Sequence, residues 1–239
     1  MTVFLTSSPM AGPGPVLNPD NGFAQRMIQA AGGVKRGLFI SSDQDDHEHN
    51  DMFAADVKTA FRNASVRFTR FQVLDSRTMH RAAQMVRQAQ LIVLAGGHVP
   101  TQNDFFQYIG LRELLYGFDG VIMGISAGTM NSADTVYAMP ELEGEALDEE
   151  YPRWLPGLGL TPTMIIPHFQ KLAGEELDGM RIIEDIAFPD SEDNCFICLP
   201  DGSYLLRQGQ TETIYGEAWQ IENGELTKLC ENGESFLLA

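Results

Sequence analysis

Residues 120–128 read Gly-Val-Ile-Met-Gly-Ile-Ser-Ala-Gly, an apolar run that leads directly into a turn of small residues. The apolar run is typical of a strand buried on both faces of a parallel sheet. Residues 127–132 are suited to begin a helix. A Gly-x-Ser-x-Gly turn between a strand and a helix exposes the serine hydroxyl, and the helix start directs backbone N–H groups toward it. The pattern therefore predicts a nucleophilic Ser126 within an α/β fold.

Short apolar runs alternate with helical patterns on the N-terminal side of this turn. Strands are expected at residues 3–6, 36–42, 66–74 and 90–95, and helices at 22–31, 52–63, 78–88 and 105–116. This alternation predicts a mostly parallel, doubly wound sheet with helices on both faces. A further strand at 164–167 and a helix at 174–186 precede short strands separated by Asp-Gly, Gly-Gln and Asn-Gly turns. These turns predict C-terminal antiparallel hairpins, within one domain spanning residues 1–239.

Composition limits the classes of protein that fit. Hydrophobic residues make up 44% of the 239 residues, which is enough for a large core and argues against disorder. The formal net charge of -17 opposes binding to the phosphate backbone of nucleic acids. No signal peptide or membrane-spanning run is predicted, so a cytoplasmic location is expected. The three cysteines are interpreted as buried, reduced thiols.

A second strand end carries paired glycines. Residues 91–95 run into Gly96-Gly97-His98, and the backbone N–H of Gly97 is a candidate oxyanion donor, although a simple tight turn has the same sequence. His168 directly follows the apolar run 164–167. Because sites in open parallel sheets form at the carboxyl ends of strands, His168 is the expected base and His98 is its rival.

A histidine base needs a carboxylate that orients it. The candidates between the serine and this histidine are Asp134, Glu141, Glu143, Glu145 and Asp148, and the residues alone do not choose among them. His47 and His49 lie in an acidic run, residues 43–51, whose composition resembles a metal site. Their spacing fits no standard set of metal ligands, which favours a solvated loop. No metal or cofactor is therefore expected.

The order of serine, acid and histidine also suggests the α/β-hydrolase fold, but too few residues separate Ser126 from His168 for that fold. The motifs Ala95-Gly96-Gly97-His98, Gly124-Ile125-Ser126-Ala127-Gly128 and Ile166-Pro167-His168-Phe169 instead resemble the serine peptidase family of dipeptidase E and cyanophycinase. The resemblance extends from the first strand to about residue 200. It implies a fold similar to class I glutamine amidotransferases, with a serine in place of the cysteine nucleophile.

The resemblance also assigns roles to residues. It implies that Ser126 is the nucleophile, that His168 is the base, and that the N–H groups of Gly97 and Ala127 bind the oxyanion. It places the acid of the triad on Glu141, where dipeptidase E has an aspartate, and Glu143 remains the alternative. His98 stands where dipeptidase E usually has an asparagine. His98 and Glu143 are therefore candidate substrate-binding residues.

The function expected from these features is hydrolysis of small peptides, as by a dipeptidase or exopeptidase, through an acyl-enzyme on Ser126. Two alternatives remain at this stage: an amidotransferase-like domain, and a non-catalytic binding domain with the same fold. Arg153 and Arg181 are candidates for recognising a peptide carboxylate. An exposed edge strand in the C-terminal hairpins would allow a homodimer.

Overall fold

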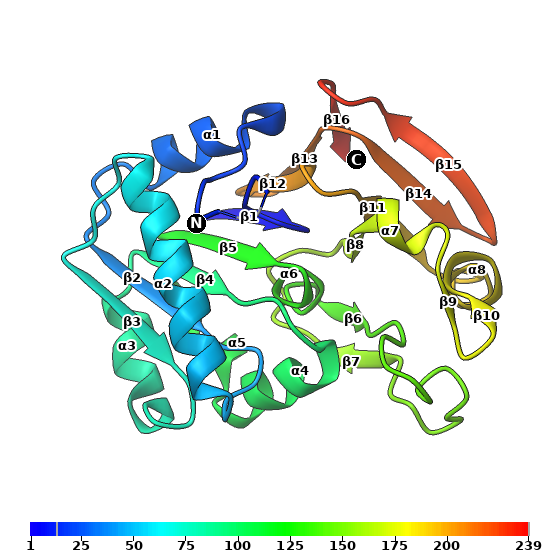
Figure 1. Cartoon of the computed structure of the whole chain (residues 1–239), viewed down its shortest axis with the longest axis horizontal. Helices are drawn as coiled ribbons and strands as arrows, with labels where there is room; N and C mark the ends of the chain where they lie inside the picture. Colours follow the sequence, from blue (N-terminus) through cyan, green and yellow to red (C-terminus); the bar gives the residue numbers. More distant parts are fainter. Residues whose placement is uncertain (13, 239) are drawn as a thin grey trace.

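A large sheet forms the centre of the molecule (Figure 1). The computed structural model describes residues 1–12 and 14–238. Five neighbouring strands of the sheet are parallel: β1 (Thr2–Thr6), β5 (Val121–Ile125), β4 (Leu91–Leu94), β2 (Arg36–Ile40) and β3 (Arg70–Leu74). Beyond β1 the sheet continues with antiparallel strands β12 (Tyr204–Gln208), β13 (Thr211–Tyr215) and β16 (Ser235–Leu238). The predicted mostly parallel sheet with C-terminal antiparallel strands is confirmed.

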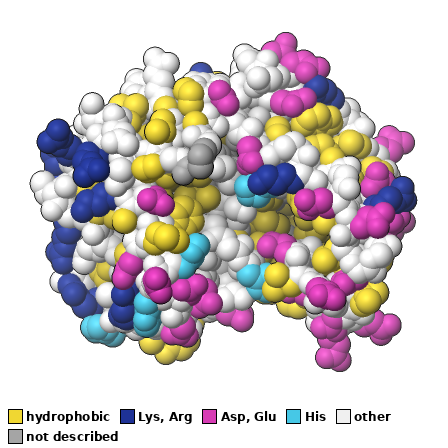
Figure 2. Space-filling view, in the orientation of Figure 1, with side chains coloured by type: hydrophobic (Ala, Val, Ile, Leu, Met, Phe, Trp, Pro, Cys, Tyr) yellow, Lys and Arg dark blue, Asp and Glu magenta, His cyan; other side chains and the backbone are white. Residues whose placement is uncertain are grey.

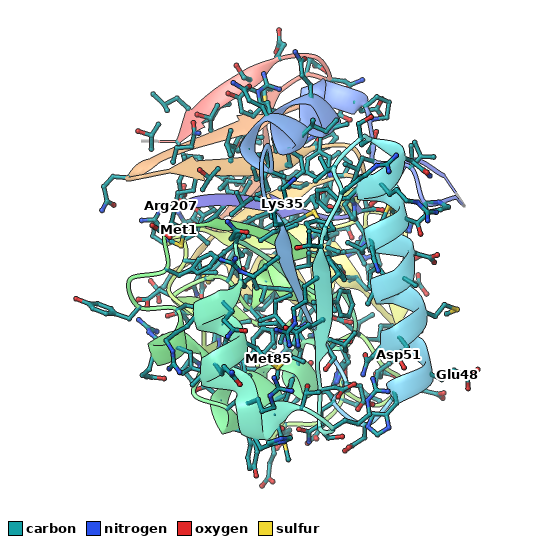
Figure 3. All side chains as sticks on the ribbon, turned by 90° about the vertical axis from the view of Figure 1, so that its left-hand side faces the viewer. Met1, Lys35, Glu48, Asp51, Met85 and Arg207 are labelled. Carbon is teal, nitrogen blue, oxygen red and sulfur yellow. The ribbon has the colours of Figure 1, made fainter. Side chains whose placement is uncertain are left out.

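Helices cover both faces of this sheet. One face carries α1 (Phe23–Ala30) and α2 (His47–Asn63), and the other carries α3 (Ala82–Gln88), α4 (Val99–Tyr108) and α5 (Leu111–Leu114). Figure 3 shows α2 and α3 on opposite sides of β2 and β3. Successive side chains of a strand point to opposite faces, so Leu38 and Ile40 join the core with α3, whereas Phe39 joins the core with α2. The apolar runs read from the sequence therefore supply two cores at once.

A second, four-stranded sheet lies beside the first. Its order is β15 (Glu225–Cys230), β14 (Ala218–Glu222), β11 (Cys195–Leu199) and β8 (Met164–Pro167), with β8 and β11 parallel. The strand expected at 164–167 thus belongs to this sheet and does not extend the first one. Shorter elements connect β5 of the first sheet to β8 of the second: α6 (Ala127–Met130), β6 (Thr135–Tyr137) and β7 (Trp154–Pro156). Others connect β8 to β11 within the second sheet: α7 (Phe169–Leu172), β9 (Glu176–Leu177), β10 (Met180–Arg181), the π-helix η3 (Ile182–Ala187) and α8 (Phe188–Asp190). Two 3-10 turns, η1 (Asp20–Gly22) and η2 (Met79–Arg81), precede α1 and α3.

Two sequence-based expectations about helices were wrong. The helix expected to begin at residue 52 begins at His47, so only the first part of the acidic run 43–51 is a loop. The Asp46 side chain accepts a hydrogen bond from the His49 N–H and caps this helix, α2. The helix expected at 174–186 is interrupted by the β9–β10 hairpin. Asp178 and Gly179 both have positive φ, as an Asp-Gly hairpin turn requires, and this local signal prevails over the apolar spacing. Among the described residues no helix is long and apolar enough to cross a bilayer.

Phe39 is fully buried in β2 and contacts Phe53 edge to face. Phe39→Ala is expected to lower the free energy of unfolding by about 3–5 kcal/mol, because it removes buried apolar surface and leaves a cavity. Urea unfolding followed by circular dichroism measures this loss. The control is Tyr116→Ala, at a side chain that is 94% exposed, which is expected to change stability by less than about 0.5 kcal/mol. Equal effects of the two substitutions would contradict this assignment of the core.

Candidate active site

Ser126 occupies a sharp turn between β5 and α6. Its backbone has φ 48° and ψ −110°, a conformation that residues with a side chain rarely adopt. Three hydrogen bonds hold the turn. The Ser126 N–H and the Thr129 hydroxyl both donate to the Thr6 carbonyl at 2.9 Å, and the Gly128 N–H donates to the Ala95 carbonyl at 3.0 Å. The ends of β1 and β4 therefore fix the conformation of this serine.

Two glycines around Ser126 leave no room for a side chain. A Cβ on Gly128 would lie 2.4 Å from the Leu94 carbonyl oxygen, so α6 approaches β4 more closely than any other residue would permit. Gly97 has φ 153°, and a Cβ there would lie 2.3 Å from the Ser42 hydroxyl. Both positions therefore require glycine, as the sequence motif indicates.

The backbone N–H groups of Gly97 and Ala127 have no hydrogen-bond acceptor among the described residues. Buried amides fix the loop that carries Gly97. The Gln102 side chain donates to the Ala95 carbonyl at 2.7 Å and accepts from Asn131, which follows α6, at 3.0 Å. Asn131 in turn accepts from Asn103 at 2.8 Å. This network joins the glycine loop to the residue that follows α6.

His168 follows β8 and begins α7 with a left-handed backbone, φ 57°. Its N–H donates to the buried Ser7 hydroxyl at 3.1 Å, and that hydroxyl donates to the Leu199 carbonyl at 2.8 Å. The imidazole Nδ1 lies 2.7 Å from a carboxylate oxygen of Asp201. The histidine is thus oriented through both its backbone and its ring.

Asp201 is held in turn by Gln170. The side-chain amide nitrogen of Gln170 donates to the second carboxylate oxygen of Asp201 at 2.6 Å. The backbone N–H of Asp201 donates to the side-chain oxygen of Gln170 at 2.9 Å. The hydrogen bond from His168 lowers the pKa of Asp201, against a smaller opposing effect of partial burial. At neutral pH Asp201 is therefore an ionised partner for the imidazole.

Asp201 was not among the acids expected from the sequence, because it lies beyond His168 and because Asp201-Gly202 has the sequence of a hairpin turn. The structure brings it to His168 through the register of the second sheet. Leu199 of β11 pairs with Pro167 of β8 in parallel, so the residues just beyond the two strands meet. A polar residue just beyond a neighbouring strand was the available signal.

The predicted acids have other environments. One carboxylate oxygen of Glu145 accepts hydrogen bonds from the N–H groups of Glu141 and Leu142, both at 2.9 Å, and the other lies 2.9 Å from His98 Nε2. His98 therefore anchors an acidic loop, and its Nδ1 contacts Thr101 at 2.8 Å. Within the described residues neither Glu141 nor Glu143 bonds to His168. The carboxylate that contacts the His168 ring belongs to Asp201, which was not among the acids expected from the sequence.

Ser126 and His168 line one pocket of about 220 Å³, together with Glu141. Figure 2 shows a hollow near the middle of this face in which hydrophobic side chains are visible, with histidine and acidic side chains at its border. Glu141 is in the lining of the same pocket as Ser126 and His168. Loss of hydration, with a smaller contribution from the negative charge of Glu145, raises the pKa of Glu141 to about 8.

A serine on a strained strand-to-helix turn, in one pocket with a histidine that a carboxylate orients, is typical of a serine hydrolase. The sequence profile of Peptidase family S51 matches residues 19–215. The chain therefore belongs to peptidase family S51, and it is a serine peptidase of the dipeptidase E type. The resemblance read from the three motifs is confirmed.

Two solved structures have the same fold. A peptidase from an acI-B1 Actinobacterium superposes with a TM-score of 0.69 at 17% identity, covering 99% of this chain and 96% of that chain. A protein from Listeria monocytogenes EGD-e, provisionally named a peptidase E protein, superposes with a TM-score of 0.63 at 14% identity, covering 89% of this chain and 96% of that chain. A comparison with curated proteins gave no match.

The environment of Glu141 predicts an unusual titration. Its carboxyl carbon, followed by ¹³C NMR, is expected to titrate with a midpoint near pH 8 in the folded protein, against the ordinary value of 4.5. Because the unfolded chain releases this proton at lower pH, Glu141 makes folding less favourable as pH rises from about 4.5 to about 8. Glu141→Gln is expected to remove that part of the pH dependence of stability. A midpoint near 4.5 would contradict the analysis.

Proposed function

We propose that Ser126, His168 and Asp201 form a catalytic triad that hydrolyses small peptides. The observation that carries the proposal is the 2.7 Å contact between His168 Nδ1 and Asp201. It fixes the tautomer with the proton on Nδ1 and leaves Nε2 free to accept a proton, in the same pocket that Ser126 lines. Asp201 takes the role that the sequence analysis assigned to Glu141.

The proposed reaction is acyl transfer in two steps. His168 Nε2 takes the proton of the Ser126 hydroxyl while Ser126 Oγ forms a bond to the peptide carbonyl carbon. The C–N bond then breaks, and the same proton passes from the imidazole to the leaving amine. In the second step His168 takes a proton from water, whose oxygen attacks the acyl-enzyme, and returns the proton to Ser126 as the acid is released. Asp201 stays ionised and stabilises the imidazolium.

The backbone N–H groups of Gly97 and Ala127 are proposed to bind the oxyanion. Their lack of an acceptor among the described residues supports this role, because preorganised donors are effective only when no other group occupies them. Ser126 follows a strand of the first sheet, whereas His168 and Asp201 follow strands of the second sheet. The proposal therefore treats residues 1–239 as a single catalytic unit, in which neither sheet is active alone.

A fluorophosphonate probe tests the nucleophile. Wild-type protein is expected to be labelled on Ser126, as read by mass spectrometry of the digested adduct, at pH 7–9. Ser126→Ala is expected to abolish labelling, and His168→Ala is expected to slow it by about 10³-fold or more, because the hydroxyl loses its base. An unlabelled wild-type protein would overturn the proposed function in favour of a non-catalytic binding domain.

A second measurement identifies the acid. Asp201→Asn is expected to lower the rate of labelling by about 10⁴-fold, because the amide no longer favours the required tautomer of His168. The control is Asp193→Asn, at an exposed aspartate outside the site, with an expected rate close to that of the wild type. Glu141→Gln is expected to change the rate by less than about tenfold, because Glu141 makes no bond to the imidazole. A larger loss in Glu141→Gln than in Asp201→Asn would return the role of acid to Glu141.

A further inference from the structure

The pocket beside Ser126 has an apolar wall and two carboxyl groups. Its apolar wall consists of Met130, Met139, Pro140, Pro167, Leu172 and Ile182. The carboxyl groups belong to Glu141 and Glu175, which approach from different loops. None of the described residues that line the pocket is a lysine or an arginine. A side chain that enters this pocket therefore meets hydrocarbon along its length and two acids.

The basic residues nearest to this region already have partners elsewhere. Arg153 is paired with Asp190, and Arg181 is paired with Asp185 at 2.7 Å. Lys171 lies 3.6 Å from the carboxylate of Asp201, outside the pocket lining. Neither Arg153 nor Arg181, the sequence-based candidates for recognising a carboxylate, lines the pocket. Within the described residues no salt bridge involves Glu141 or Glu175, so their acidity is not neutralised by the protein.

Hydrogen bonds hold the two loops that carry these acids. Glu145 accepts from the N–H of Glu141 and is itself bonded to His98, on the loop that follows β4. Asp178, in the hairpin that follows Glu175, accepts from the N–H groups of Gly144 at 2.9 Å and Ala146 at 3.2 Å. The two pocket walls are thus tied to each other and to the glycine loop. The loops that carry the two carboxyl groups are therefore held before a substrate binds, which favours selective recognition.

We propose that this pocket receives the side chain of the residue whose carbonyl Ser126 attacks, and that it selects a long aliphatic side chain with a positive charge at its end, as in lysine or arginine. This inference rests on the proposed role of Ser126. The apolar wall contacts the aliphatic stem, and Glu141 and Glu175 pair with the cationic group. An aspartyl or glutamyl side chain is disfavoured, because its carboxylate would lie beside two carboxyl groups with no basic partner in the pocket lining.

The proposal is tested with α-aminoalkyl diphenyl phosphonates that carry the side chains of lysine, norleucine and aspartate. The serine oxygen bonds to phosphorus, phenoxide leaves, and the hydroxyl proton passes to His168, so the rate reports entry of the side chain without any need for turnover. Rates are measured at pH 9, where the lysyl ammonium is still charged and Glu141 is mostly ionised. The other titratable groups around Glu141 are Glu145, Tyr151, Glu175 and His168.

The expected second-order rate with the lysyl probe is at least about tenfold above that with the norleucyl probe, and the aspartyl probe is slowest. Glu141→Gln and Glu175→Gln are each expected to reduce the ratio of lysyl to norleucyl rates about three- to tenfold. Glu176→Gln and Glu149→Gln are matched controls, because these exposed residues lie close to the two acids in the chain but outside the pocket lining. Both controls are expected to keep the wild-type ratio.

Each probe is prepared with a free and with an acetylated amino group, so that recognition of the α-amino group is separated from recognition of the side chain. A ratio near one in the wild type, a fastest reaction with the aspartyl probe, or an unchanged ratio in both glutamate variants would overturn the proposal. A labelling rate that depends only on whether the amino group of the probe is free, and not on its side chain, would also overturn the proposal. If the fluorophosphonate labels Ser126 in the same preparations, these outcomes reject the specificity and leave the proposed function standing. Without that labelling, the proposed function itself fails.

Discussion

Ser126 has a backbone conformation that is unfavourable by itself, and the surrounding structure is built to maintain it. A residue with a side chain in such a conformation persists only where its neighbours determine it. Here the carbonyls at the ends of β1 and β4 accept the N–H groups of Ser126 and Gly128. The missing Cβ of Gly128 lets α6 lie against the Leu94 carbonyl. The central strands of the first sheet therefore hold the backbone of Ser126 directly, through hydrogen bonds at their carboxyl ends.

His168 and Asp201 follow strands of the second sheet, and Ser7 links the two sheets. Ser7 directly follows β1, and its hydroxyl contacts both the Leu199 carbonyl and the N–H of His168. The parallel register of β8 and β11 then places His168 beside Asp201. The imidazole is about one quarter exposed and the carboxylate about one third exposed, so solvent screens this pair and its geometry matters more than its Coulomb energy. A partly open site is also what a substrate needs in order to reach the histidine.

Buried polar side chains form a rigid support around the site. Gln102, Asn103 and Asn131 are almost fully buried and bond to one another and to backbone carbonyls. Polar groups in a core stabilise one arrangement when their hydrogen bonds are satisfied, and they are costly when they are not. Such a network resists small shifts between the glycine loop and the serine turn. Glu145 and Asp178 hold the exposed loops beside the pocket in a similar way, because they accept hydrogen bonds from backbone N–H groups.

The sequence by itself determined the features that depend on neighbouring residues: the strand, turn and helix around Ser126, the apolar strands of a mostly parallel sheet, and His168 at the end of its strand. Local spacing and backbone sterics decide these features. The tertiary structure alone decided that 164–167 joins a second sheet, that residues 176–181 form a hairpin, and that Asp201 rather than Glu141 contacts His168. The contact between His168 and Asp201 depends on the register between β8 and β11, a long-range pairing that no local pattern encodes. The same register brings Gln170 to the Asp201 carboxylate.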